Sequence, residues 1–451
     1  MRVTLIATYE MGRQPFGLAS PAAWLRRAGI DVTCLDLSRQ PFDAKAAGAD
    51  LVAFHLPMHT ATRLAVPVIA QVRRLNPTAR LCAYGLYAPL NEEFLRSVGI
   101  DHLLGGEFEA DLVRLAGGIG AGEDASMPPP SRLPYPSRLP RLQLIPPWRD
   151  GLPPLEQYAT LQQGAARRVA GYTEASRGCK HTCRHCPVVP VYDGRFRVVQ
   201  ADVVLADVAA QVEQGAEHVT FGDPDFFNGV GHAVRVVEGV ARRFPGLSYD
   251  VTIKVEHLIA HADLLPRLRE TGCLFVTSAV ESFDNAVLAR LEKGHTRRDI
   301  EQAVDLCRAV GVTLAPTFVA FTPWTTVEGY RDMLAEIERL DLVEHVAPIQ
   351  LALRLLVTAG SRLLELDELD EHLEAFDAEH LVYPWRHPDH RVDQLADDVR
   401  AMVGRRLTAG RRELFDAIRG RAHDEDPSRS TPAAPVRQRV EVPYLNEPWY
   451  C

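Results

Sequence analysis

Residues 174–187 read Glu-Ala-Ser-Arg-Gly-Cys-Lys-His-Thr-Cys-Arg-His-Cys-Pro, and the interpretation of the whole sequence starts from them. Cys179, Cys183 and Cys186 follow a C-x3-C-x2-C spacing on one short loop, just after an alternating apolar–polar run. Thiolates are the ligands of iron–sulfur clusters, and a [4Fe–4S] cluster normally takes four of them. Three close thiolates leave one iron without a protein ligand. An open metal position is what a catalytic site needs, because a substrate or cofactor can coordinate there.

Two structural interpretations of the loop stand beside this one. A structural zinc site uses paired cysteines, or two cysteines with two histidines, and His181 or His185 would then supply the fourth ligand. Both histidines lie in the same tight loop, which makes tetrahedral closure awkward. The other alternative is a disulfide with one spare thiol, which an intracellular protein disfavours.

Composition bounds the class of protein. The 451 residues suffice for two or three domains, and 46% apolar with 24% charged residues is ordinary for a globular protein. A net charge of −9 argues against a general nucleic-acid surface. The eight cysteines do not form a disulfide framework in a chain this long. The first apolar run is too short for a signal peptide, and no stretch approaches a membrane span. We therefore expect a cytoplasmic protein without membrane contact.

The first 117 residues alternate between short apolar strands and amphipathic helices. This rhythm is typical of a doubly wound, Rossmann-like α/β domain with a parallel sheet, whose ligands lie at the carboxyl ends of the strands. The predicted strands cover residues 2–8, 31–37, 50–54, 80–85 and 101–104.

The remaining chain divides by composition. Residues 118–164 form a proline-rich linker, because proline continues neither a helix nor a central strand. Strand–helix units then fill residues 165–358, and parallel barrels place catalytic loops at the carboxyl ends of such strands. Residues 359–424 predict a helical extension, and residues 425–451 predict a flexible tail. The predicted strands of the second series are 168–175, 217–222, 248–254, 274–280, 313–320 and 347–353.

The cysteine loop resembles that of the radical S-adenosylmethionine (SAM) superfamily, in which the amino acid end of SAM chelates the fourth iron. The resemblance implies that residues 165–358 form a partial (β/α)6 barrel with the loop directly after its first strand. Residues 1–117 resemble the cobalamin-binding domain that precedes many such barrels, through Phe16-Gly-Leu-Ala-Ser-Pro-Ala-Ala-Trp-Leu and Gly105-Gly-Glu-Phe-Glu. The cobalt-ligating Asp-x-His-x-x-Gly signature is absent. A Rossmann-like domain that only covers the barrel therefore stays the alternative.

The resemblance also implies SAM-binding residues after successive strands. Phe221-Gly-Asp-Pro-Asp resembles the family's Gly-Gly-Glu motif, so Gly222 and Asp223 would hold the methionine ammonium; a plain Asp-Pro turn is the alternative. The stretch from Ser278 to Thr296 resembles a run found in cobalamin-type and methylthiotransferase-like members. In that run Glu281 and Ser282 would approach the ribose or carboxylate of SAM.

Three further strand ends carry candidate residues. Phe321 and Thr322 occupy the position that relatives place beside the adenine, although they replace the small residues of the family motif. Lys254 lies near the predicted barrel mouth, where a surface ion pair is the alternative role. Arg354, after the sixth predicted strand, is a candidate substrate or carboxylate anchor, or else an arginine that snorkels from the barrel edge.

The last ten residues, Val-Pro-Tyr-Leu-Asn-Glu-Pro-Trp-Tyr-Cys, are rich in aromatic side chains and end on Cys451. They resemble radical SAM proteins whose tails finish in Cys-Cys-Ala-Glu-Pro or Cys-selenocysteine-Ala-Glu-Pro (CCAEP and CUAEP tails). Because a stop codon encodes selenocysteine, we hypothesise that Cys451 is followed in the genome by selenocysteine-Ala-Glu-Pro. Cys451 would then take part in thiol–selenol redox chemistry; a merely exposed terminal cysteine is the alternative.

Together these features imply a radical SAM enzyme. It would reductively cleave SAM at a [4Fe–4S] cluster into methionine and a 5′-deoxyadenosyl radical, which acts on a small-molecule or peptide substrate. The first domain would add cobalamin-assisted methyl or alkyl transfer. The C-terminal tail would add sulfur or selenium chemistry. Electrons would come from a donor such as flavodoxin or ferredoxin. The alternative is a non-catalytic iron–sulfur or zinc-binding protein whose Rossmann-like domain binds a partner.

Overall fold

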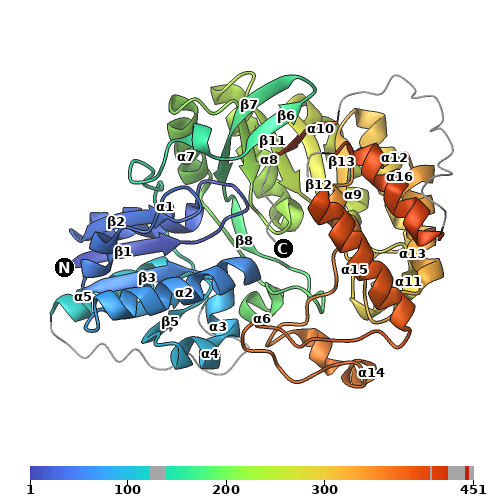
Figure 1. Ribbon diagram of the computed structural model, residues 1–451. Coiled ribbons are helices and arrows are strands. Elements are labelled where there is room, and N and C mark those ends of the chain that lie inside the picture. The colour runs from blue at the N-terminus through green and yellow to red at the C-terminus, as the bar shows by residue number, and fades with distance from the viewer. Residues whose placement is uncertain (122–138, 407–408, 425–441, 446–451) are drawn as a thin grey trace.

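The structure, a computed structural model, describes residues 1–121, 139–406, 409–424 and 442–445 of the chain. An N-terminal sheet, blue in Figure 1, lies beside a larger curved sheet drawn in green and yellow. Within the described ranges, every helix is too short or too polar to cross a bilayer.

The N-terminal sheet confirms the predicted doubly wound domain. Its strands run parallel in the order β2-β1-β3-β4-β5, one of the common doubly wound orders. Every residue of β3 is buried, as expected of a parallel strand with helices on both faces. The elements are β1 (Arg2–Ala7), α1 (Phe16–Arg27), β2 (Asp31–Asp36), β3 (Leu51–His55), α2 (His59–Leu75), β4 (Arg80–Tyr84), α3 (Tyr87–Leu90), α4 (Glu92–Ser97), β5 (His102–Leu104) and α5 (Glu109–Gly120).

The second sheet is the curved wall of a partial barrel, which confirms the predicted fold class. Its parallel strands lie in the order β13-β12-β11-β10-β7, and helices separate them along the chain. The strands are β7 (Ala166–Thr173), β10 (His218–Phe221), β11 (Ser248–Thr252), β12 (Cys273–Glu281) and β13 (Thr313–Phe318). The helices are α7 (Ala201–Glu213), α8 (Val230–Arg243), α9 (Val255–Ala260), α10 (Leu265–Glu270), α11 (Asn285–Arg290), α12 (Arg297–Val310) and α13 (Val327–Arg339).

The sixth predicted strand, residues 347–353, is absent: Pro348–Leu351 form a 3-10 turn instead. Two residues explain the difference. Pro348 cannot donate to a ladder, and the side chain of Gln350 takes the place of a backbone acceptor, because its Oε1 accepts from the Phe318 N–H at 3.0 Å. The chain rejoins the sheet edge further on, through a single parallel bridge between Phe321 and Arg354.

Short strands extend the barrel sheet where the sequence predicted none. β6 (Thr160–Gln163) lies within the predicted linker and pairs antiparallel with β7. β14 (Tyr444–Leu445) lies within the predicted flexible tail and pairs antiparallel with β6, so the described part of the tail is held against the sheet. A separate ribbon of β8 (Ser176–Gly178) and β9 (Phe196–Val198) encloses the cysteine loop.

The C-terminal extension is only partly helical. α15 (His390–Arg405) and α16 (Arg411–Ala422) pack on the barrel core through Val392, Leu395, Leu414 and Ile418. α14 (Asp367–Asp370) is a single turn, and the following segment up to residue 389 forms loops with isolated bridges. The helical extension thus begins later than the sequence predicted.

One buried arginine ties the predicted linker to both domains. Arg149 donates to Asp207 of α7 (Nε–Oδ1, 2.6 Å) and to the carbonyl of Tyr172 in β7 (2.7 Å). It also donates to Gln14 Oε1 of the N-terminal domain (2.6 Å). The two sheets are therefore held with their carboxyl ends close together.

Candidate active site

The cysteine loop lies between β8 and the short helix α6 (Val189–Tyr192). Cys179 and Cys183 are buried and Cys186 is half-buried, and none of them forms a disulfide. Burial, together with the neighbouring Cys183 and Cys179, raises the pKa of the Cys186 thiol to about 12. Thiols in such surroundings stay neutral unless a metal replaces the proton. The donor set therefore fits a cluster held on these residues.

Two lysines supply positive charge beside the thiols. Lys254 Nζ lies 3.7 Å from Cys183 Sγ and 2.8 Å from Glu256 Oε2. Lys293 donates to Glu281 Oε1 at 3.3 Å, and this carboxylate raises the pKa of Lys293, although burial alone lowers it. Cationic side chains of this kind stabilise an anionic cluster. The structure thus places Lys254 beside a predicted ligand, while it also makes the ion pair of the alternative role.

Glu281 lies at the end of β12 but is committed to the loop. Its Oε1 is 3.2 Å from His185 Nε2 and 3.3 Å from Lys293 Nζ. Burial alone would raise the pKa of Glu281, yet Lys293 and His185 hold it at about 2. The residue has φ 68°, in the left-handed region, where strain is characteristic of functional sites. Glu281 therefore shapes the cysteine loop in this structure, whereas SAM contact stays a prediction.

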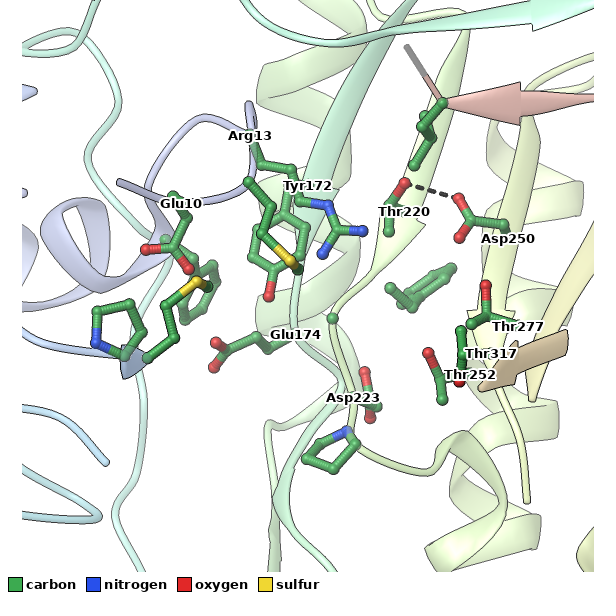
Figure 2. A pocket seen from close by; sticks show the side chains of 18 of the residues that line it. Glu10, Arg13, Tyr172, Glu174, Thr220, Asp223, Asp250, Thr252, Thr277 and Thr317 are labelled. Carbon is green, nitrogen blue, oxygen red and sulfur yellow. Dashed lines mark hydrogen bonds between the residues drawn. The ribbon is translucent and has the colours of Figure 1, made fainter. Parts of the chain in front are cut away.

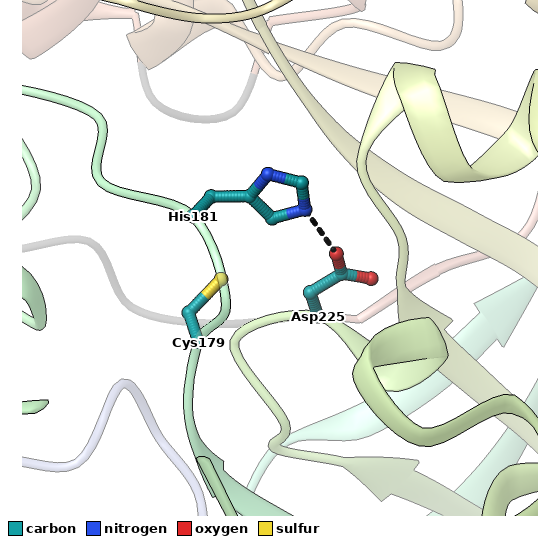
Figure 3. A group of neighbouring side chains, drawn as sticks. All are labelled: Cys179, His181 and Asp225. Atoms are coloured by element: carbon teal, nitrogen blue, oxygen red, sulfur yellow. Dashed lines mark ion pairs between the residues drawn. The ribbon is translucent and has the colours of Figure 1, made fainter. Parts of the chain in front are cut away.

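His181 forms a second cluster of polar groups beside the loop (Figure 3). Its Nε2 lies 3.4 Å from Asp225 Oδ2, and His257 Nδ1 lies 2.6 Å from the same oxygen. The ligand atoms of Cys179, His181 and Asp225 lie within 4.8 Å of one another, a spacing that could hold a metal ion. The two loop histidines of the zinc alternative are thus each turned to a carboxylate, His181 to Asp225 and His185 to Glu281.

Gly222 and Asp223 follow β10 and line a cavity. A Cβ atom at Gly222 would meet the hydroxyl of Tyr172 at 1.9 Å, so only glycine fits there. Asp223 accepts from the Ala175 N–H (2.9 Å) and from Ser176 Oγ (2.5 Å). Burial raises the pKa of Asp223 to about 7, although these two hydrogen bonds oppose the shift.

Other predicted residues make local contacts and do not line the cavity. Ser282 Oγ accepts from the Asp284 N–H before α11. Phe321 is fully buried and stacks on Tyr330, with ring centroids 4.7 Å apart. Thr322 is hydrogen-bonded to Thr325 Oγ1 at 2.9 Å. Both side chains therefore make packing and local contacts in this structure, and the adenine contacts of Phe321 and Thr322 stay a prediction.

Arg354 does not reach the cavity either. Its Nη1 pairs with Asp393 of α15 at 2.8 Å, and its guanidinium lies over the Trp385 ring at 4.0 Å from the centroid. Arg354 thus holds the C-terminal extension at the barrel edge, and its role as a substrate or carboxylate anchor stays a prediction. Cys451 lies outside the described residues.

A cavity of about 500 Å³ opens between the carboxyl edges of the two sheets and runs into the barrel (Figure 2). Glu10, His55 and Phe108 line it from the N-terminal domain, and Asp223 and Asp250 line it from the barrel. A cavity of this size suits a small molecule. Of these residues, the sequence motifs had included only Asp223 and Phe108. The alternation along a barrel strand, which turns every second side chain inward, is the signal that points to Asp250.

Comparison with known proteins identifies the larger domain. Residues 173–334 match the model of the Radical SAM superfamily. The chain is 26% identical to tRNA-2-methylthio-N(6)-dimethylallyladenosine synthase of Magnetococcus marinus over 42% of its length and 46% of that protein. It is 24% identical to hopanoid C-3 methylase of Methylococcus capsulatus, over 69% of its length and 62% of that protein. The chain thus spans only about half to three-fifths of these relatives.

Solved structures agree with both domains. OxsB, a cobalamin-dependent SAM radical enzyme solved with aqua-cobalamin and SAM, aligns with 94% of this chain and 71% of its own, at a TM-score of 0.68 and 12% identity. TsrM of Kitasatospora setae, a radical SAM methyltransferase, aligns with 75% of this chain and 71% of its own, at a TM-score of 0.58 and 20% identity. Residues 173–334 thus match a radical SAM domain, and the chain shares the two-domain fold of the cobalamin-dependent enzyme OxsB. The cofactors of that superfamily are a [4Fe–4S] cluster and SAM.

The cavity also fits a ligand at the edge of the N-terminal sheet. Gly85 (φ 107°) and Gly106 (φ 52°) bring bare backbone to its wall. Glu10 Oε2 and His55 Nδ1 are buried 3.3 Å apart, and neither has a well-formed hydrogen bond among the described residues. Buried polar atoms of this kind are normally satisfied by water or a ligand.

Proposed function

We propose that this protein is a radical SAM enzyme that carries its [4Fe–4S] cluster on Cys179, Cys183 and Cys186 and binds SAM and substrate in the adjoining cavity. The observation that carries the proposal is the set of three free thiols in one loop, next to the cationic Lys254. When bound, the cluster supplies the electron for reductive cleavage of SAM.

The chain's own residues prepare the site in three ways. The β8–β9 ribbon and α6 enclose the loop, which keeps water from the cluster ligands. Gly222 lets the backbone after β10 approach a ligand closely. Asp223 offers a buried carboxyl to the methionine ammonium, and a cation beside it would favour the ionised form.

We propose cobalamin as a further cofactor, held at the edge of the first sheet by residues that include Glu10, His55 and the backbone of Gly106. The fold and the unsatisfied polar atoms at this edge support the proposal. When bound, cobalamin supplies methyl or alkyl transfer. The substrate is a small molecule or peptide, the electron donor a flavodoxin or ferredoxin, and the compartment the cytoplasm.

We also propose that this protein is related to the radical SAM proteins with CCAEP or CUAEP tails, because of its own C-terminal residues. Pro443, Tyr444 and Leu445 line the cavity, so the segment that ends in Cys451 starts at its wall. Covalent geometry limits the reach of the six residues after Leu445 to roughly 20 Å, which is enough to span a small-molecule cavity. Sequencing the gene beyond the Cys451 codon tests the idea, which ends if no codons for Ala-Glu-Pro follow.

The enzyme assignment is tested by anaerobic reconstitution with iron and sulfide, followed by dithionite and SAM. We expect cluster absorbance and 5′-deoxyadenosine from the wild type, and neither from Cys183→Ala. Cys307→Ala is the matched control, because Cys307 is a buried thiol of α12 outside the loop. A tightly bound zinc in place of the cluster would establish the non-catalytic alternative.

A further inference from the structure

A row of polar side chains crosses the barrel sheet inside the cavity. Thr220 of β10 is the register partner of Asp250 in β11, and Thr252 of β11 is the partner of Thr277 in β12. Thr317 continues the row on β13, and all five residues line the cavity. The interior of a parallel barrel is ordinarily filled by branched apolar side chains. Polar side chains on four neighbouring strands therefore indicate that this interior receives a polar ligand.

Three hydroxyls of the row are free to bind it. Thr252, Thr277 and Thr317 are half-buried, and within the described ranges none of their side chains makes a hydrogen bond. Thr220 differs, because its hydroxyl donates to Asp250 Oδ1 at 2.6 Å (Figure 2). Hydroxyls at a cavity wall that have no protein partner are open to water or to a ligand.

Asp250 is the charged member of the row. It is only 3% exposed, and its Oδ1 accepts from Thr220 and lies 2.9 Å from His218 Nε2. Ser248 Oγ lies 2.8 Å from His218 Nδ1. Ser248 Oγ also donates to the carbonyl of Glu217 at 3.3 Å, so both ring nitrogens of His218 and the serine hydroxyl have partners. Within the described ranges the contacts of the Asp250 carboxylate all go to Oδ1, so Oδ2 remains an open acceptor at the cavity wall.

The other acids on the cavity wall are already engaged. Glu174 pairs with Arg177 at 2.8 Å, and Glu10 lies 3.3 Å from His55. Asp223 accepts two hydrogen bonds and has a pKa of about 7 because it is buried. Since Asp223 is the acid proposed above for the methionine ammonium of SAM, Asp250 is the acid of the barrel wall that is left for a substrate.

The cations on the wall lie against tyrosine rings. The Arg13 guanidinium is 5.1 Å from the ring centroid of Tyr172, and the Arg411 guanidinium is 4.5 Å from that of Tyr444. Within the described ranges, the side chain that pairs with Asp250 is His218, at 2.9 Å. Asp250 Oδ2 thus remains for a ligand, and a carboxylate in a cavity binds an ammonium group by strong, charge-assisted hydrogen bonds.

We propose that the barrel end of the cavity receives the ammonium group of a small polar substrate, with Asp250 as its anchor and Thr252, Thr277 and Thr317 binding its hydroxyl or amide groups. The inference rests on the proposed function, because it names the substrate class of the same cavity. The substrate class is a small molecule that carries an amine together with hydroxyl or amide groups.

Matched six-carbon probes test the proposal on the full chain. D-glucamine, D-sorbitol and D-gluconate share a polyol chain and carry a positive, neutral and negative end. Saturation-transfer difference NMR should give the tightest binding for glucamine, at least about tenfold tighter than for gluconate. Asp250→Asn should reduce glucamine binding about tenfold, to the level of sorbitol. Equal binding of glucamine and gluconate, or unchanged glucamine binding in Asp250→Asn, would overturn the proposal.

Thr277→Val is a second variant that keeps the side-chain shape and removes one hydroxyl. It should weaken both glucamine and sorbitol several-fold, whereas an unchanged profile contradicts the hydroxyl row. If Asp250→Asn does not reach the wild-type Tm, the probe series on the wild type and Thr277→Val decide the matter. The binding measurements use no SAM, so a negative result does not affect the assignment as a radical SAM enzyme. Conversely, a protein that forms no 5′-deoxyadenosine can still be tested for binding of the probes.

Discussion

Arg177 of the barrel and Glu109 of the N-terminal domain form a buried, two-pronged ion pair across the domain interface, with Nη2–Oε1 at 2.7 Å and Nη1–Oε2 at 3.0 Å. Glu174 and Glu107 also approach the guanidinium, at 2.8 and 3.6 Å. Burial alone would lower the pKa of Arg177, but these carboxylates raise it well above its ordinary value. The pair therefore fixes the edge of the first sheet against the strand end that carries the cysteine loop.

Removing the guanidinium should destabilise the protein strongly. Arg177→Met leaves Glu109 buried and without its cation, which typically costs about 3–5 kcal/mol of unfolding free energy. Urea unfolding followed by circular dichroism measures the loss. Arg242→Met is the control, because Arg242 and Glu238 form a long ion pair on the surface of α8, where the contribution of such pairs is small. Equal effects of the two substitutions would contradict a structural role for the Arg177 pair.

Gly222 should tolerate no side chain. In Gly222→Ala the new Cβ atom lies 1.9 Å from the Tyr172 hydroxyl, so β7 and the segment after β10 must move apart. We expect a loss of about 1–3 kcal/mol in unfolding free energy and weaker SAM binding by calorimetry. Gly231→Ala in α8 is the control, since nothing lies within 4 Å of its Cβ position and alanine favours a helix. The expectation fails if Gly222→Ala binds SAM as the wild type does.

The spacing of residues in the sequence predicted those parts of the site that lie within one continuous stretch of the chain. The cysteine loop and the strand before Gly222 needed only spacing and apolar runs. Arg177 and Glu109 meet across 68 positions, and no local pattern pairs them. The sixth strand failed for a related reason, since its apolar residues favoured a strand but the tertiary contact of Gln350 with Phe318 replaced the ladder. For Phe321, the sequence likewise predicts only a position after β13. Its stacking on Tyr330 is a tertiary contact that the sequence does not predict.

Asp223 should make the ligand-free protein less stable as the pH rises. Burial raises its folded pKa from the ordinary 3.8 to about 7, so between these values the folded state holds a proton that the unfolded chain releases. Stability is therefore lost across this window, by at most about 4 kcal/mol above pH 7. Asp223→Asn stays neutral, so its unfolding free energy relative to the wild type should rise from about pH 4 to about pH 8. Asp305→Asn, at an exposed site on α12, is the control, and a parallel profile for the two variants refutes the expectation.

Lys254 should set the reduction potential of the reconstituted cluster. Its Nζ lies 3.7 Å from Cys183 Sγ, and the residue is only 6% exposed, so water screens its charge weakly. Reduction adds a negative charge to the centre, which a neighbouring cation stabilises. Lys254→Met should therefore shift the potential to more negative values by about 60 mV, the one-electron equivalent of about 1.4 kcal/mol. A redox titration followed by electron paramagnetic resonance measures the shift. Lys45→Met, at an exposed position of the N-terminal domain, removes the same charge far from the loop. Identical potentials for the two variants would show that Lys254 does not act on the cluster.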